Sequence, residues 1–258
     1  MNTVEFFKYQ GTGNDFIMVD NRSLSFPKSQ EIIERLCHRR FGIGADGLIL
    51  LEDSREYDFQ MVYYNSDGAQ STMCGNGGRC IVAFAHDLGL ISSSCRFMAV
   101  DGLHHATIRN GSVALGMVDV SAIHPHGEEF ILNTGSPHLV CPVEKVSEIE
   151  VASLGRYKRN EEPFKKEGIN VNFSQELSPG RIKIRTYERG VEDETFSCGT
   201  GATAAALVHM SRHGLCEVAV EVVGGELTIR GRQKTDGSFE NIWLEGPAKN
   251  VFKGEILV

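Results

Sequence analysis

Two cysteines stand in the same short sequence context, each directly before Gly-x-Gly. Cys74 opens CGNGGRCIVAFAHDLGL and Cys198 opens CGTGATAAALVHMSRHGL, and each apolar segment ends at Gly-Leu. A cysteine at the start of a helix lies near unpaired backbone N–H groups and the positive end of the helix dipole. These groups favour the thiolate over the thiol and form a cradle for an anion. Both cysteines are therefore candidate acid–base groups.

The chemistry that suits two such thiols is inversion at a carbon atom. One thiolate removes a proton from one face of the carbon, and the other thiol delivers a proton to the opposite face. The intermediate places its charge on the substrate carboxylate, where each preorganised N–H donor is worth about 3–4 kcal/mol. Neither a metal nor an organic cofactor is then required. The alternative is that each cysteine is a small buried hydrophobe at a tight turn.

An internal repeat favours the chemical interpretation, because it places the two cysteines at equivalent positions. Cys198 follows Cys74 by 124 residues. Further matches in the same order are Tyr64 with Tyr187, Thr107 with Thr228 and Thr12 with Thr134, at offsets of 123, 121 and 122 residues. Collinear matches over most of a chain indicate a duplicated unit. The sequence therefore predicts two similar halves.

Each half has the pattern of an α/β fold of the α+β type, with more strands than helices. The apolar segments 79–88 and 202–213 predict a buried central helix in each half, wrapped by a strand-rich sheet. An amphipathic helix is expected over 29–40, with Ser29 as its N-cap and Gly42 beyond its end. Strands are expected at 58–63, 112–118, 181–186, 219–223 and 241–244.

The expected domains are residues 1–120, which include Cys74, and residues 121–258, which include Cys198. The C-terminal strand is allowed to cross over to the first half. The boundary is expected within 118–129, where Pro125, Gly127 and two histidines interrupt the pattern. The active site is expected in the cleft between the halves.

Composition narrows the class of partner. The 258 residues have a formal net charge of −8, which argues against attraction to nucleic acid or an anionic membrane and favours a small-molecule ligand. No apolar run reaches the ~18 residues of a membrane span, and the N-terminus does not have the pattern of a secretory signal. Seven scattered cysteines favour reduced thiols and a cytoplasmic location. The oligomeric state is open, with a homodimer allowed.

Other thiol and metal chemistries fit the sequence less well. A thiol redox enzyme would have a close cysteine pair such as Cys-x-x-Cys, whereas the closest spacing here is that of Cys74 and Cys80. A zinc site needs a set of ligands at metal spacing, which Cys37-His38 or His104-His105 alone do not provide. No metal site is predicted. The remaining cysteines are assigned to packing: Cys37, Cys80, Cys95, Cys141 and Cys216.

The ordered set of motifs resembles the diaminopimelate epimerase family nearly from end to end. The motifs are GTGNDF, RRFGIGADGL, YNSDG, CGNGGRC, GSPH, INVNF, YERG and CGTGA. The resemblance implies that LL-diaminopimelate is converted to meso-diaminopimelate, for lysine and peptidoglycan synthesis, without a cofactor. It also implies that Cys74 and Cys198 are the catalytic pair.

The resemblance extends to residues that would bind the substrate or assist the thiols. Backbone groups around the two cysteines would hold the carboxylate at the reacting centre, and polar side chains would hold the rest of the substrate. The implied binding residues are Asn14, Asn65, Gly75, Asn76, Asn170, Glu188, Arg189, Gly199 and Thr200. His138 is the implied auxiliary group that helps to ionise a cysteine, with Ser136 beside it.

Two positions depart from the family pattern, and two alternatives stay open. Ser136 stands where well-known members have asparagine, and Gly47 stands where some have glutamine, so that two substrate-facing amides are missing. Substrate identity is therefore less firmly predicted than reaction type. The nearest alternative is a proline or hydroxyproline racemase of the same superfamily. The alternative outside the enzymes is a small-anion-binding protein.

Overall fold

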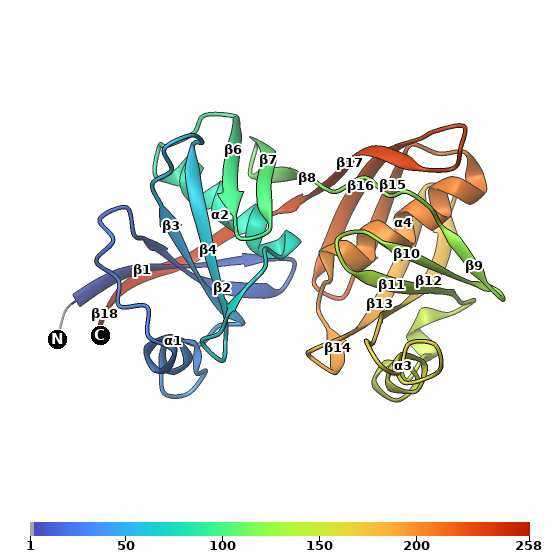
Figure 1. The fold of residues 1–258 in the computed structure, drawn as a ribbon, viewed down its shortest axis with the longest axis horizontal. Helices are drawn as coiled ribbons and strands as arrows, with labels where there is room; N and C mark the ends of the chain where they lie inside the picture. Colours follow the sequence, from blue (N-terminus) through green and yellow to red (C-terminus); the bar gives the residue numbers. More distant parts are fainter. Residues whose placement is uncertain (1–2) are drawn as a thin grey trace. The chain divides into compact units, whose positions relative to one another are not determined.

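The computed structural model describes residues 3–258, which divide into two compact units (Figure 1). Unit 1 consists of the chain up to Leu115 together with Gly246–Val258, and unit 2 consists of Gly116–Glu245. Among the described residues, no helix is long and apolar enough to cross a membrane.

Unit 1 is built from a mixed sheet and two helices. Its strands are β1 (Thr3–Gly11), β2 (Asn14–Asp20), β3 (Gly47–Glu52), β4 (Phe59–Asn65), β5 (Gln70–Ser71), β6 (Ser94–Ala99), β7 (Gly102–Arg109), β8 (Ser112–Gly116) and β18 (Lys249–Leu257). The order across the sheet is β18-β1-β2-β3-β4-β6-β7-β8, and β5 pairs with β4. The β2–β3 and β4–β6 pairs are parallel, and the other pairs are antiparallel.

Unit 2 repeats this plan. Its strands are β9 (His124–His126), β10 (Glu129–Asn133), β11 (Pro137–Pro142), β12 (Asn170–Ser178), β13 (Arg181–Glu188), β14 (Asp193–Thr195), β15 (Glu217–Val222), β16 (Gly225–Gln233) and β17 (Phe239–Pro247). The order is β9-β10-β11-β12-β13-β15-β16-β17, and β14 pairs with β13. The parallel pairs are β11–β12 and β13–β15.

The two sheets match strand for strand in order and direction. The run β1-β2-β3-β4-β6-β7-β8 corresponds to β10-β11-β12-β13-β15-β16-β17, and the parallel pairs fall at the same two places. This confirms the α+β class and the two pseudo-symmetric halves that the repeat predicts. The final strand, β18, pairs with β1 along most of its length, so the end of the chain completes unit 1.

A buried helix lies against the sheet of each unit. Helix α2 (Gly75–Asp87) packs against β1, β2, β3 and β7, and α4 (Gly199–His213) packs against β10–β13, β15 and β16 (Figure 1). Both helices begin earlier than the predicted 79 and 202, directly after the cysteine. Gly-x-Gly is a poor helix former in isolation. Here the backbone is held by tertiary packing, since Gly77 and Gly201 are buried.

Helix α1 (Gln30–Cys37) confirms the predicted N-cap but ends earlier than expected. The Ser29 side chain accepts a hydrogen bond from the backbone N–H of Ile32. The helix stops at Cys37, because the backbone N–H groups of Ile43 and Gly44 fold back onto the carbonyl of Leu36. A Cβ on Gly42 would lie 2.0 Å from the carbonyl oxygen of Arg35, so glycine is needed for this reversal.

Unit 2 has two further short helical segments, η1 (Val146–Glu148) and α3 (Val151–Arg159). Helix α3 packs on β13, where a Cβ on Gly155 would lie 2.3 Å from Cβ of Tyr187. The buried core beneath α3 includes Val151, Phe173 and Tyr187.

Candidate functional site

Cys74 is the N-cap residue of α2. Its backbone is extended, and Sγ accepts a hydrogen bond of 3.2 Å from the backbone N–H of Gly77. The sulfur therefore occupies the position of a capping oxygen and satisfies one of the unpaired donors of the first turn. A Cβ on Gly77 would lie 3.2 Å from this sulfur and 3.0 Å from Cδ1 of Ile49, so the turn packs closely at this point.

Asn76 and Asn14 form a pair beside Cys74. The Asn76 side chain is buried and donates a hydrogen bond of 3.3 Å to Oδ1 of Asn14. Asn14 in turn donates to Oδ2 of Asp46, which accepts a further hydrogen bond from the backbone N–H of Asp15. Asn14 thereby connects the first turn of α2 with an acidic cluster.

Two cations hold this acidic cluster together. Arg39 contacts Asp15 and Asp46 at 2.7 Å each, and the buried Lys8 contacts Asp15 at 2.7 Å. Burial alone would raise the pKa of Asp15, but the hydrogen bonds and charges of Arg39 and Lys8 lower that pKa to about 2. Asp15 therefore stays ionised at neutral pH, and its ion pairs with Arg39 and Lys8 hold the loop that positions Asn14.

Arg79 lies fully buried one turn into α2. It donates to Oγ1 of Thr12 at 3.0 Å and to the carbonyl of Gly75 at 3.4 Å. Burial lowers the pKa of Arg79, while the nearby thiols of Cys80 and Cys74 act in the opposite direction. A positive charge is thus held under the helix turn that begins at Cys74.

Asn65 lies at the end of β4 and opens the turn that leads to α2. Its backbone N–H bonds to the carbonyl of Ala69 at 2.9 Å, and its carbonyl accepts from Gly68 at 3.0 Å. Gly68 has a positive φ of 78°, which suits glycine. The half-buried Asn65 side chain is therefore held on a tight turn.

Cys198 is the N-cap residue of α4 and the counterpart of Cys74. Its Sγ lies 3.4 Å from Oγ1 of Thr200, and the residue is buried. Oγ1 of Thr200 also lies 3.4 Å from Oγ of Ser136. The backbone carbonyl of Thr200 accepts a hydrogen bond of 2.9 Å from the Thr134 hydroxyl. Cys198 is thus connected through two hydroxyl groups to the interior of unit 2.

His138 is the fully buried centre of this network. Its Nε2 lies 3.1 Å from Oγ of Ser136, and its Nδ1 lies 3.1 Å from Nδ2 of Asn172. Burial and then the charge of Arg189 lower the pKa of His138 to about 3. The imidazole is therefore neutral at neutral pH, and it reaches Cys198 through Ser136 and Thr200 rather than as a charged neighbour.

The partners of Asn172 determine the tautomer of His138. Oδ1 of Asn172 accepts from Thr186 at 3.0 Å, so Nδ2 is the atom that donates to the Leu139 carbonyl at 3.1 Å and to Nδ1 of His138. Because an amide nitrogen only donates, Nδ1 accepts and the ring proton lies on Nε2. His138 then donates to Ser136, which leaves the serine and threonine hydroxyls to donate toward the sulfur of Cys198.

Asn170 connects the same network to the loop that contains Arg189. Its Nδ2 donates to Oγ of Ser136 at 3.0 Å and to the carbonyl of Pro137 at 3.1 Å. Its Oδ1 accepts from the backbone N–H of Arg189 at 2.9 Å. The exposed Arg189 guanidinium bonds to the carbonyl of Glu167 at 3.1 Å, and Glu188 lies half-buried at the end of β13.

The chain matches the model of the family described as diaminopimelate epimerase over residues 6–119 and 130–250. This chain belongs to the diaminopimelate epimerase family. A diaminopimelate epimerase from Flavobacterium psychrophilum is 51% identical over 98% of this chain and 100% of its own length. One from Aquifex aeolicus is 40% identical over 98% of both chains. By name, these relatives are isomerases.

Solved structures with the same fold are more distant in sequence. A phenazine biosynthesis protein of the PhzF family from Bacillus anthracis matches with a TM-score of 0.76 at 15% identity, over 100% of both chains. A hydroxyproline epimerase from Agrobacterium vitis, with bound trans-4-hydroxy-L-proline, matches with a TM-score of 0.69 at 14% identity, over 98% of this chain and 92% of that one. At these identities the similarity concerns the fold alone.

The departure at Gly47 from other diaminopimelate epimerases has a structural reason. A Cβ on Gly47 would lie 2.5 Å from the carbonyl oxygen of Tyr64 and 2.6 Å from Cε2 of Tyr63. A side chain at this position would therefore collide with backbone on the neighbouring strand β4. Ser136 stands at the other position that departs from the family pattern. Its hydroxyl forms hydrogen bonds with both His138 and Asn170, so its partners lie within the protein.

The assignment of the remaining cysteines to packing is correct for all except Cys216. Cys37, Cys80, Cys95 and Cys141 are buried, and burial raises the pKa of Cys37, Cys80 and Cys95 to about 12. Cys216 is exposed, because it lies in the short link between the end of α4 and β15.

Sequence reasoning missed three residues that support the two cysteines. The signal for Arg79 is an arginine inside an otherwise apolar helix, and the signal for Asn172 is a polar residue inside a buried strand. The third is Thr134, which together with Thr12 entered the sequence analysis only as a landmark of the repeat. Thr12 binds Arg79 of α2, and Thr134 binds Thr200 of α4, so equivalent threonines anchor the two equivalent helices.

Proposed function

We propose that this protein converts LL-diaminopimelate to meso-diaminopimelate with Cys74 and Cys198 as its acid and base. The observation that supports the pair most strongly is that each cysteine is the N-cap of the buried helix in one of two units with the same topology. The names of the relatives, at up to 51% identity, support the substrate.

The proton balance requires one thiolate and one thiol at the start of each turnover. The thiolate takes the Cα proton, and the electron pair passes into the substrate carboxylate. The opposite thiol then gives its proton to the other face of Cα, so that the two sulfurs exchange roles. Exchange with solvent, or turnover in the reverse direction, restores the starting state. No electrons are gained or lost, so the step needs no redox partner.

The binding residues are proposed in the same way. Backbone N–H groups at Gly75, Asn76, Gly199 and Thr200 would hold the carboxylate at the reacting carbon, since the first turns of α2 and α4 present such donors. Asn14, Asn65, Asn170, Glu188 and Arg189 would bind the remaining polar groups. Asn14 and Asn170 also form hydrogen bonds to other residues of the protein, so each side chain helps to position its neighbours.

The test is inversion of LL-diaminopimelate by purified protein without added cofactor, in heavy water. Early product should contain deuterium at Cα, while recovered LL-diaminopimelate contains almost none. Cys74→Ala and Cys198→Ala should each lower the rate by about 10²–10⁴-fold, the range for a general acid–base group. Cys216→Ser, which changes an exposed thiol, is the matched control and should retain the parent rate.

Four results would contradict the proposal. The first is equal early labelling of substrate and product, which indicates a single base. The second is near-parent activity in either alanine variant. The third is turnover of proline or hydroxyproline with none of LL-diaminopimelate, which would favour the racemase alternative. Carboxylate binding without any turnover would instead indicate an anion-binding protein.

We further propose that the protein works in the cytoplasm as a homodimer. The cysteines of the described chain are free, and a thiol pair needs a reducing compartment to remain active. Fractionation of cells and sedimentation of the purified protein test these two statements separately.

A further inference from the structure

A cluster of metal-ligating side chains lies in unit 2, at the end of α4 opposite to Cys198. His209 and His213 are four residues apart on this helix, and Glu176 faces them from β12. A four-residue spacing places both imidazoles on one face of the helix. His209 lies 11 residues beyond Cys198, which is about 16 Å along the helix. The cluster is therefore separate from the thiol.

The distances suit a single divalent ion. Oε2 of Glu176 lies 3.2 Å from Nε2 of His213 and 3.8 Å from Nδ1 of His209, and one ligand atom from each residue lies within 4.8 Å of the others. Tetrahedral zinc with bonds near 2.0–2.1 Å separates its ligand atoms by about 3.3 Å. The pair Glu176–His213 already has this spacing, and the ligand atoms that lie farther apart, by up to 4.8 Å, would have to move closer on binding an ion.

His209 gives a second, independent indication of a ligand. Its side chain is 94% buried, because only 6% of its surface is exposed. Nδ1 is the ring nitrogen that faces Glu176, and Nε2 on the other side of the ring has no hydrogen-bond partner within residues 3–258. A buried polar group without a partner is costly, and such groups commonly indicate an ion or a water.

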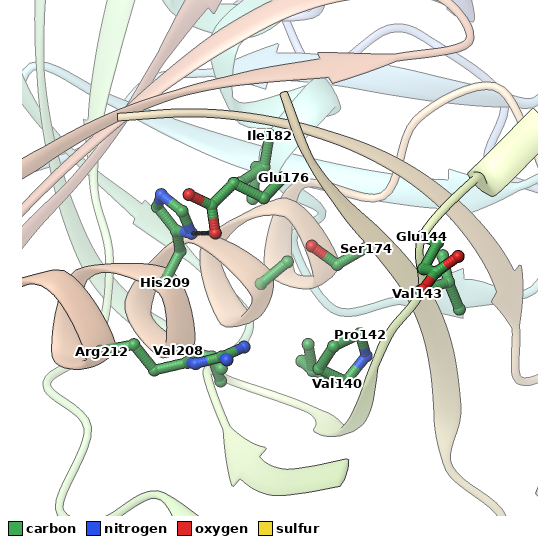
Figure 2. A pocket seen from close by; sticks show the side chains of 11 residues that line it. Val140, Pro142, Val143, Glu144, Ser174, Glu176, Ile182, Val208, His209 and Arg212 are labelled. Atoms are coloured by element: carbon green, nitrogen blue, oxygen red, sulfur yellow. Dashed lines mark ion pairs between the residues drawn. The ribbon is translucent and has the colours of Figure 1, made fainter. Parts of the chain in front are cut away.

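A pocket beside the cluster provides room for the rest of a coordination shell. Glu176 and His209 both line a cavity of about 270 Å³, whose other walls include Pro142, Val208 and Arg212 (Figure 2). In Figure 2 the carboxylate of Glu176 and the imidazole of His209 point toward one another. A water in liquid occupies about 30 Å³, so the cavity accommodates water ligands.

We infer that Glu176, His209 and His213 form a binding site for a divalent transition metal, with zinc as its best match. Two imidazoles, one carboxylate and a water complete a four-coordinate shell. The ion would connect the last turn of α4 to the end of β12, and so stabilise unit 2 at a distance from the thiols. The sequence alone did not predict this site, because Glu176 lies 33 residues before His209 and only the fold brings it to the His-x-x-x-His pair.

The test is titration of the chelator-stripped, full-length protein with zinc. It is done in the Cys216→Ser background, since an exposed thiol would compete for the ion. One equivalent of zinc should bind and raise the thermal unfolding midpoint. His213→Ala and Glu176→Gln should each weaken binding by about tenfold or more, the least expected when even an outer-shell partner is lost. Both side chains are partly exposed, so circular dichroism should show an intact fold.

The matched control is His124→Ala, which removes an exposed histidine of the same unit and should leave zinc binding unchanged. Cobalt serves as a spectroscopic probe, because histidine and carboxylate ligands give only weak visible bands, whereas thiolates add strong near-ultraviolet absorption. Absence of zinc binding in the parent, binding as tight as the parent's in both ligand variants, or a thiolate signature would each overturn the inference. Should one ligand variant misfold, the result of the other decides.

Discussion

Thr200 is the residue whose hydroxyl connects Cys198 to the buried network of unit 2. Its Oγ1 lies 3.4 Å from the sulfur and 3.4 Å from Ser136, while its backbone carbonyl is held by Thr134. The side chain is therefore placed to donate to a thiolate, and the backbone position does not depend on the hydroxyl. Removal of the hydroxyl should affect chemistry more than structure.

We predict that Thr200→Val lowers kcat by about tenfold, because a hydrogen bond to a charged acceptor is worth about 1.5–3 kcal/mol. Thr200→Ser, which keeps the hydroxyl, should recover most of the activity. The measurement is steady-state epimerisation, together with the alkylation rate of Cys198 followed by peptide mapping. Equal activity of the valine and parent proteins would show that the contact has no effect on the sulfur.

His138 should make stability depend on pH between about 6.5 and 3. Its pKa is lowered to about 3 in the fold, against an ordinary value of 6.5, so the unfolded chain binds one more proton in this window. Stability is then fully present above pH 6.5 and is lost as pH falls, by up to about 1.4 kcal/mol per pH unit. His138→Gln should flatten this dependence between pH 6 and 4.5.

The comparison uses urea unfolding at several pH values, each curve expressed relative to pH 7. His124→Gln, at an exposed position, is the control and should keep the parent slope. The carboxyl of Asp15 changes stability mainly below pH 4, since its pKa falls from 3.8 to about 2 in the fold, so the comparison is made between pH 6 and 4.5. A parent-like slope in His138→Gln would show that the buried imidazole is not the source.

At the scale of elements, the glycines of the two helix starts differ in what surrounds them. A Cβ on Gly201 would lie 2.2 Å from Oδ1 of Asn172, a side chain that is held by three hydrogen bonds. A Cβ on Gly78 would meet only Sδ of Met73 at 2.9 Å and Cδ2 of Leu115 at 3.0 Å, which are flexible side-chain ends. Substitution by alanine is therefore expected to be costly at Gly201 and nearly neutral at Gly78.

We predict that Gly201→Ala lowers the free energy of unfolding by about 2 kcal/mol or more and impairs catalysis, because the Asn172–His138 contact is displaced. Gly78→Ala should be close to neutral, since alanine gains up to about 1 kcal/mol of helix propensity that offsets the crowding. Urea unfolding and the epimerisation rate check both variants. Similar losses in the two proteins would mean that helix packing, rather than Asn172, sets the requirement for glycine.

At the scale of the whole molecule, the two units differ in how the chain closes them. Unit 2 is one continuous segment, whereas unit 1 needs the returning strand β18 against β1. This strand also contacts the core of unit 1, since Phe252 packs edge-on against Phe6 with ring centroids 6.0 Å apart. The last residues of the chain are therefore part of the first structural unit.

Removal of residues 249–258 should destabilise unit 1 before unit 2. Hydrogen exchange should show loss of protection in β1 and β2, while β12 and β13 keep theirs, because the unpaired edge lies in unit 1 only. The control is Phe252→Leu, which keeps the strand but removes the aromatic contact with Phe6. Equal loss of protection in both units would show that they unfold as one body.

The sequence by itself determined the features that depend on local pattern and repetition. Helix propensity, the cap at Ser29, strand alternation and the collinear repeat are all encoded within short segments, so they predicted two similar α+β halves with Cys74 and Cys198 at equivalent helix starts. The ordered motifs were sufficient to indicate the family, because each consists of contiguous residues.

Only the tertiary structure decided which distant side chains meet. The early end of α1 depends on Gly42 and on a loop that folds back onto the Leu36 carbonyl of the helix. The neutral state of His138 depends on burial beside Asn172, which is 34 residues away in sequence. The exposure of Cys216 follows from its place in the link between α4 and β15, and Glu176 meets His209 because α4 packs against β12. These contacts arise from close packing between elements, which no local pattern of residues contains.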